Sequence, residues 1–149
     1  MAMKTEHIPQ ADKYRNNQMQ AEKQVQTGIS LIYDHFKNEI EERLRRIYDG
    51  FMSLKKEGHA VDAIAPEAAI YLTIKIDLTG KKTAEGKILN TQSDVTSYIL
   101  NTAGLAVVPF YAFGADRSSP WYRLSAGTCK KEEIDEMISK LKEALRKLS

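Results

Sequence analysis

The sequence has little of what stabilises secreted or membrane proteins. Cys129 is its single cysteine, so no intramolecular disulfide can form. No run approaches the roughly eighteen consecutive apolar residues that a membrane-spanning helix requires. Met1–Gln10 carries Lys4 without an apolar run after it, which predicts an irregular arm and not a secretory signal. We therefore expect a cytoplasmic protein without membrane partners.

The sequence also lacks the motifs of several self-contained chemistries. The three histidines are widely separated along the chain: His7, His35 and His59. None belongs to a His-x-x-x-His or Cys/His cluster, so a metal site is not supported. Gly80 and Gly86 are too far apart for a glycine-rich phosphate loop. Cys129 has no nucleophile signature nearby and is interpreted as a packing residue.

The charge balance argues against a nucleic-acid partner. Lysine and arginine number 22, aspartate and glutamate number 20, and the net charge is therefore +2. The two signs alternate along most of the chain, whereas nucleic-acid binding requires a concentrated positive face. A length of 149 residues is ordinary for one domain.

Helical spacing of apolar residues predicts a long helix over Ala11–Lys56, with Gly58 in the left-handed position common after a helix. Its second half carries one apolar stripe at spacings of three and four: Ile29, Ile32, Phe36, Ile40, Leu44, Ile47, Phe51 and Leu54. The first half, Ala11–Gln26, is far more polar, and Thr27 or Gly28 is predicted to divide the two as a weak cap. Such a polar half either lies against a surface that this chain does not supply or bridges solvent.

Three segments have the pattern of strands. Ala69–Leu78 alternates apolar and polar residues, Leu105–Phe110 is a short continuous apolar run, and Trp121–Ala126 alternates again. Thr79–Asn90 is turn-rich and predicts an exposed, hairpin-like excursion.

Two further helices are predicted. One covers Ser93–Ala103, capped by Thr91 or Ser93 and closed by Gly104, and the other covers Lys131–Leu148. Together with the strands they indicate an α+β fold: a small mixed sheet of about three strands, covered by helices, with a long N-terminal helix. We expect residues 1–26 to form an arm and polar helical segment, and residues 27–149 the domain.

One residue is unusual for its position. Arg123 lies in the middle of the short strand Trp121–Ser125, between aromatic and apolar residues. A guanidinium there suggests a carboxylate or phosphate partner, because its planar fork binds such groups bidentately. Two alternatives remain open: Arg123 points outward from an edge strand, or it pairs with an internal acid such as Asp116.

Two stretches resemble the C-terminal signature of class I/II aminotransferases, the aspartate-aminotransferase-like enzymes that use pyridoxal phosphate. They are Gly104-Leu-Ala-Val-Val-Pro-Phe-Tyr-Ala-Phe-Gly114 and Trp121-Tyr-Arg-Leu-Ser-Ala-Gly127. Ala65–Asp77 is similar to the first small-domain strand of that family, and Glu132–Leu148 is similar to its closing helix. The resemblance extends over most of the chain from about Ala11 onward.

The resemblance implies a small-domain fold and a role for Arg123 in binding the α-carboxylate of an amino-acid or 2-oxo-acid substrate. It implies that the loop residues Phe110, Ala112, Phe113 and Gly114 line the same site. It also implies that the long helix joins this domain to a larger one.

The family's cofactor motifs have no counterpart in this sequence: a Schiff-base lysine, an aspartate for the pyridine nitrogen and a phosphate cup. We therefore expect no cofactor on this chain alone and no transamination by it. Three interpretations stay open: a fragment of an aminotransferase, a subunit of a split enzyme with its cofactor domain elsewhere, or a free-standing binding or assembly module. An exposed long helix and an unpaired domain face favour a homo-oligomer.

Overall fold

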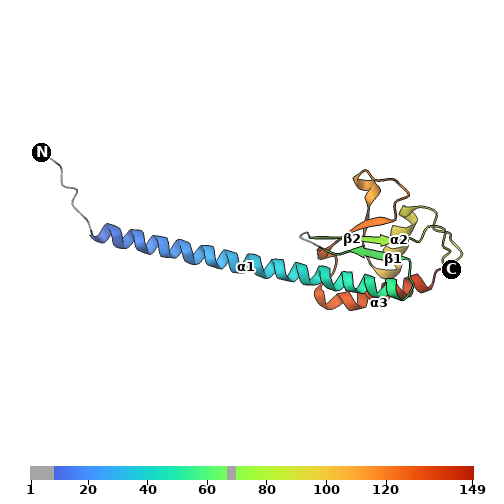
Figure 1. Cartoon of the computed structure of the whole chain (residues 1–149), viewed down its shortest axis with the longest axis horizontal. Coiled ribbons are helices and arrows are strands. Elements are labelled where there is room, and N and C mark those ends of the chain that lie inside the picture. The colour runs from blue at the N-terminus through green and yellow to red at the C-terminus, as the bar shows by residue number, and fades with distance from the viewer. Residues whose placement is uncertain (1–8, 67–69) are drawn as a thin grey trace. The chain divides into compact units, whose positions relative to one another are not determined.

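The computed structural model describes residues 9–66 and 70–149. They fall into two compact units, one ending at Asn38 and the other covering Glu39–Ser149 (Figure 1). Helix α1, Pro9–Lys56, contributes to both units. Most of the predicted arm Met1–Gln10 and the first residue of the predicted strand, Ala69, lie outside the described residues.

In the first unit, α1 leaves its large apolar side chains exposed: Tyr14, Met19, Val25, Ile29, Leu31, Ile32, Tyr33 and Phe36. The helix continues through Thr27 and Gly28, so the predicted cap between two helices is wrong. The Thr27 hydroxyl donates to the Lys23 carbonyl one turn earlier at 2.9 Å, a bond that a threonine can make inside a helix. The division of the chain at residue 26 remains a prediction.

The second unit contains one four-stranded sheet. Its strands are β1 (Val61–Ile64), β2 (Tyr71–Ile76), β3 (Val108–Pro109) and β4 (Trp121–Ser125), in the order β1-β2-β4-β3. This confirms the α+β class with a small sheet and a long N-terminal helix.

Three details of the predicted sheet are corrected. Every described pair of strands is antiparallel, whereas a mixed sheet was expected. The edge strand β1 was not predicted, because four residues are too few for a clear alternation. The apolar run Leu105–Phe110 forms only the two-residue strand β3, and Leu105 is buried in the core without belonging to a strand.

The two faces of the sheet differ sharply in burial. Leu72, Ile74 and Ile76 of β2 and Tyr122 and Leu124 of β4 are completely buried. They form one core with helix residues Leu44, Ile47, Phe51, Val95, Ile99, Ile134 and Leu141. The alternate residues of the same strands point to the opposite, open face and are exposed or half-buried.

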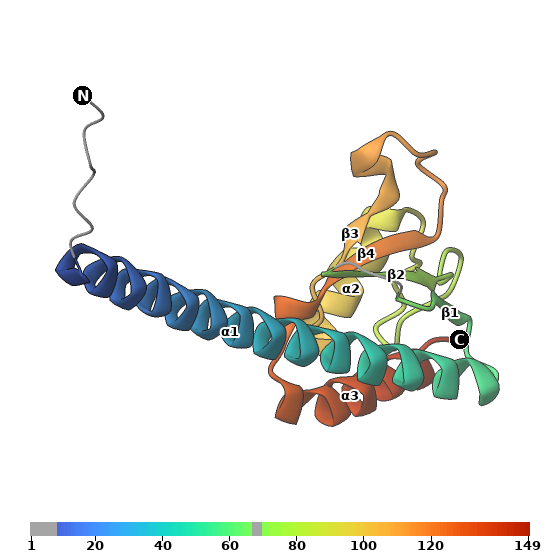
Figure 2. The ribbon, with the colours of Figure 1, turned by 60° about the vertical axis from the view of Figure 1, so that its left-hand side comes forward.

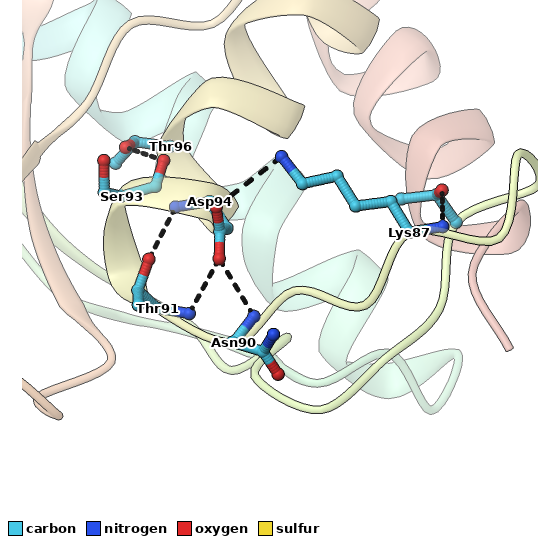
Figure 3. A network of polar contacts seen from close by, with 7 residues as sticks. Lys87, Asn90, Thr91, Ser93, Asp94 and Thr96 are labelled. Atoms are coloured by element: carbon cyan, nitrogen blue, oxygen red, sulfur yellow. Dashed lines mark hydrogen bonds and ion pairs between the residues drawn. The ribbon is translucent and has the colours of Figure 1, made fainter.

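The caps predicted for the helix near residues 93–103 are observed, whereas the last helix is shorter at both ends than the predicted Lys131–Leu148. Helix α2, Gln92–Ala103, has Thr91 as its N-cap in a capping box with Asp94, and Gly104 closes it with φ +69° (Figure 3). Helix α3, Ile134–Arg146, follows a 3-10 turn at Lys131–Glu133 and runs along the C-terminal part of α1 (Figures 1 and 2). The hairpin-like excursion is confirmed by an antiparallel bridge between Lys82 and Ile88.

Helix α1 has 48 residues, more than a bilayer requires. Even so, neither α1 nor any other helix of the described ranges contains a stretch apolar enough to cross a membrane.

The close contact between α1 and α3 gives a first prediction. A Cβ atom built on Gly50 would lie 2.6 Å from Ile138 Cγ1, so Gly50→Ala forces the two helices apart or Ile138 into another rotamer. We expect the free energy of unfolding to fall by about 1–3 kcal/mol in urea denaturation, as is usual for overpacking. Gly28→Ala is the matched control, because it adds the same methyl group to α1 with nothing within 4 Å. A Gly50→Ala variant as stable as this control would contradict the packing described.

Candidate functional site

Arg123 lies at the centre of the sheet. Strand β4 pairs with β2 on one side and β3 on the other, and Arg123 is opposite Thr73 and Val108 in the two registers. The alternative that Arg123 belongs to an edge strand is therefore wrong. Because its neighbours Tyr122 and Leu124 point into the core, the side chain of Arg123 projects from the open face.

Two aromatic rings hold the guanidinium of Arg123. Its Cζ atom lies 4.8 Å from the centroid of the Tyr71 ring and 4.2 Å from that of the Phe113 ring. Tyr71 is diagonal to Arg123 across the β2–β4 pair, and Phe113 comes from the 3-10 turn η1, Phe110–Phe113. Stacking on aromatic faces restrains the guanidinium while leaving its N–H groups, which lie in its plane, free to donate.

Within the described ranges, Arg123 has no acidic partner. Asp116, the acid considered from the sequence, accepts hydrogen bonds from Ser118 Oγ at 2.6 Å and from Ser118 N at 2.8 Å. These two bonds hold the pKa of the Asp116 carboxyl below its usual value, with the hydroxyl contributing most. The Asp116 carboxylate therefore accepts its hydrogen bonds from Ser118 in the same turn. The alternative pairing of Asp116 with Arg123 is not observed.

The open face next to Arg123 favours an anion. Lys75 projects from β2 on the same face and lies 6.0 Å from the Trp121 ring centroid. The acidic residue within the described strands, Asp62, accepts from Lys55 Nζ at 2.9 Å and from the Ala63 backbone N–H at 2.8 Å. Both bonds lower the pKa of Asp62, and so does the charge of Lys75, which is opposite Asp62 in the β1–β2 register. One carboxylate therefore faces two lysines, and together with Arg123 this leaves excess positive charge for a ligand.

The predicted loop residues contribute unequally. Phe113 reaches the guanidinium, and Phe110 packs edge-on against Phe113 with ring centroids 6.5 Å apart. Ala112 is exposed and Gly114 closes the turn with φ +92°, a conformation that favours glycine. Neither Ala112 nor Gly114 has a ring to stack on Arg123, so both shape the loop and do not grip the arginine.

Two further residues that bear on the site, Tyr71 on the open face and Gln92 on the core side of the sheet, were not predicted from the sequence. Tyr71 supplies the second aromatic face, but its place beside Arg123 depends on the strand register, which the sequence does not specify. Gln92 is buried among apolar residues and hydrogen-bonds to Tyr122, the neighbour of Arg123. Its only sequence signal is its position directly after the N-cap Thr91.

The described residues contain no cluster of metal ligands and no fully buried lysine. No group of three metal-ligating side chains occurs in residues 9–66 and 70–149. The lysines of these ranges are exposed or half-buried. Where their pKa is shifted, at Lys131 and Lys140, it is raised, chiefly by the hydrogen bonds that these lysines donate to the carboxylates of Glu42 and Glu136. A lysine that attacks a carbonyl requires the opposite shift.

Comparisons with known proteins identify the family of the chain. The family profile described as "Aminotransferase class I and II" matches residues 13–141. Over 99 residues the chain is 34% identical to a probable aspartate/prephenate aminotransferase of Rickettsia felis. This alignment covers 66% of this chain and 23% of that protein. Over 90 residues it is 36% identical to an aspartate aminotransferase of Rhizobium meliloti, covering 60% of this chain and 21% of that one.

A solved structure of aspartate aminotransferase from Rhizobium meliloti superposes with a TM-score of 0.63 and 29% sequence identity. The superposition covers 75% of this chain and 26% of the solved one. The chain therefore spans about a quarter of the length of these relatives. With the family profile matched from residue 13 to residue 141, the chain belongs to the class I and II aminotransferases.

Proposed function

We propose that this chain supplies the substrate-carboxylate clamp of an enzyme that transfers an amino group between an amino acid and a 2-oxo acid. The observation that supports it best is the guanidinium of Arg123, stacked between Tyr71 and Phe113 without an acidic partner in the described ranges. An arginine held in this way lacks only a planar anion to complete its hydrogen bonds.

The clamp works by orientation. A carboxylate that accepts two parallel N–H bonds from Arg123 is fixed in position and in rotation, so the carbon next to it is presented in one direction. The two rings keep the guanidinium in one plane before the substrate arrives, which lowers the entropy lost on binding. Lys75 on the same face adds attraction for an anion without fixing its geometry.

Pyridoxal phosphate, the cofactor of the family, supplies the chemistry of amino-group transfer when it is bound. The residues in the described ranges do not fit that group, since their lysines are neither buried nor shifted toward a neutral amine. A further stretch of polypeptide, in the same chain or in a partner, therefore carries the cofactor site and completes the enzyme. The chain alone is inactive. The cytoplasmic location expected from the sequence remains a prediction.

The exposed apolar residues of α1 support a second element of the proposal, an assembly role. Val25, Ile29, Ile32 and Phe36 leave a continuous apolar stripe in solvent within the first unit. Such a stripe is covered in a working protein by the cofactor-carrying partner or by another copy of the chain. The alternative function, a non-catalytic binding or assembly module with the small-domain fold, rests on this same stripe.

Joining the chain to the missing part tests the proposed function. We define the rejoined enzyme as this chain fused to the part of the Rhizobium meliloti aspartate aminotransferase that it does not cover. The rejoined enzyme is expected to convert aspartate and 2-oxoglutarate at least a hundredfold faster than the chain alone, in a coupled assay with added pyridoxal phosphate.

The chain alone, treated with pyridoxal phosphate and borohydride, is expected to show no stoichiometric adduct at a single lysine by mass spectrometry. Such an adduct would mean that the chain has its own cofactor site. An inactive rejoined enzyme that folds and binds the cofactor would favour the non-catalytic alternative.

A further inference from the structure

Gln92 is a buried polar side chain on the core side of the sheet, and two of its three hydrogen bonds go to the residue before Arg123 and to the loop that carries Phe113. It is only 4% exposed, and a buried amide is costly unless its hydrogen-bonding groups are satisfied. Its Nε2 donates to Thr79 Oγ1 and to the Ser118 carbonyl, both at 3.2 Å. Its Oε1 accepts from the hydroxyl of Tyr122. Gln92 thus makes three bonds to three separate segments of the chain.

The bond to Ser118 anchors the segment 110–120, which we call the clamp loop. Within the described ranges, Gln92 is the one side chain outside the clamp loop that hydrogen-bonds to it. Inside the loop, the Asp116 carboxylate accepts from Ser118 N and Oγ and so fixes the direction of the Ser118 carbonyl. The backbone N–H of Ile76 in β2 also donates to the Pro120 carbonyl at 2.9 Å, at the end of the clamp loop. At residue 118 the loop is held by Asp116 from within and by Gln92 from the body of the domain.

The other end of the amide reaches the strand that carries Arg123. Tyr122 precedes Arg123 in β4, and its side chain is completely buried on the opposite face of the sheet. Burial raises the pKa of Tyr122, so its hydroxyl keeps the hydrogen that it donates to Gln92. Gln92 itself is held at the first residue of α2 by the capping box of Thr91 and Asp94 (Figure 3).

We propose that Gln92 is a positioning residue for the clamp: it holds the clamp loop against β4, so that Phe113 stays stacked on Arg123. The rigid start of α2 is connected by one amide to the loop that carries Phe113 and to the strand that carries Arg123. The consequence for catalysis rests on the proposed function, but the placement of Phe113 over Arg123 does not.

A purely stabilising role for Gln92 gives a different expectation. Loss of any of its bonds would then lower the free energy of unfolding without altering the surroundings of Arg123. The two roles are separated by a signal that reports ring placement and not stability. The Nε–H proton resonance of Arg123 is such a signal, because the ring currents of Tyr71 and Phe113 shift it away from that of a solvated arginine.

Three variants separate the effect of the bond between Gln92 and the clamp loop from the effect of its bond to Thr79. Gln92→Glu keeps an acceptor for the Tyr122 hydroxyl but places a carboxylate oxygen against the Ser118 carbonyl, which breaks the bond to the loop. Asp116→Ala removes the turn that directs the Ser118 carbonyl, and it concerns an exposed residue. Thr79→Val is the matched control, since it removes the other Nε2 bond and leaves the loop bond intact.

The experiment measures the Arg123 Nε–H shift in the ligand-free chain, with Phe113→Leu as the reference for an arginine that has lost this ring. We expect Gln92→Glu and Asp116→Ala to move the shift at least halfway toward the Phe113→Leu value, and Thr79→Val to leave it unchanged. If Gln92→Glu does not fold, Asp116→Ala decides alone.

The proposal is overturned if a folded Gln92→Glu or Asp116→Ala variant keeps the wild-type shift. It is also overturned if Thr79→Val moves the shift as far as the loop variants, or if Phe113→Leu does not differ from wild type. A carboxylate titration of the wild-type chain tests the proposed function separately. The ligand-free shifts could be as expected while the carboxylate produces no saturable shift at Arg123. That combination would reject the substrate role of Arg123 and keep the positioning role of Gln92.

Discussion

Replacing Arg123 with alanine in the rejoined enzyme is expected to lower kcat/KM for an α-amino acid by about 30- to 900-fold. The fold-change corresponds to about 2–4 kcal/mol for the loss of one bidentate charged contact in the transition state. We expect kcat to fall and KM to rise, because the same contact binds the carboxylate and orients the carbon beside it. Initial rates over a range of aspartate concentrations measure it.

Arg123→Lys is the matched control for charge. Lysine keeps the positive charge but loses the planar fork and its fit between the two rings. We expect its kcat/KM to lie between those of the wild type and Arg123→Ala, with most of the loss remaining. Unchanged kcat/KM in Arg123→Ala would remove this residue from the substrate site, and full activity in Arg123→Lys would reduce its role to electrostatic attraction.

The second large effect concerns the packing that supports the site. Phe51 of α1 is completely buried in the core that carries the sheet. Phe51→Ala is expected to lower the free energy of unfolding by about 3–5 kcal/mol, because it removes a buried aromatic side chain and leaves a cavity. Urea denaturation followed by far-ultraviolet circular dichroism measures the change, and the slope m shows whether the transition remains two-state.

Phe36→Ala provides the comparison on the same helix. Phe36 belongs to the same apolar stripe of the sequence but is 62% exposed. Its replacement should change the free energy of unfolding by no more than about 0.5 kcal/mol. Equal losses at both positions would show that the first unit of α1 packs against apolar surface in solution, for example in an assembly of several copies.

Local signals in the sequence were sufficient for much of the fold. Thr91, Asp94 and Gly104 define the ends of α2 because capping depends on a few neighbouring residues. Alternation over Ala69–Leu78 and Trp121–Ala126 predicted the strands β2 and β4, in which every second side chain is buried, but it left the orientation of Arg123 open. The apolar stripe of α1 gave the helix, and burial of Leu44, Ile47 and Phe51 confirmed its inward face.

Features that depend on contacts between distant segments could not be predicted in this way. The ring of Tyr71 faces Arg123 only because β2 pairs with β4 in one register, and register is set by the whole core. Gln92 gives no sign in the sequence of bonds to residues 79, 118 and 122. Thr27 and Gly28 resembled a helix boundary, but neither residue breaks a helix by itself, and α1 continues through both.

The most direct test of the account is a titration of the intact chain with aspartate and with 2-oxoglutarate, observed at the arginine Nε–H resonances. The account predicts a saturable shift at Arg123. Arg46 serves as the internal control, because it already pairs with Asp135 at 3.2 Å and should respond only to ionic strength. An Arg123 resonance that moves no more than that of Arg46 would contradict the central claim that this arginine binds the substrate carboxylate.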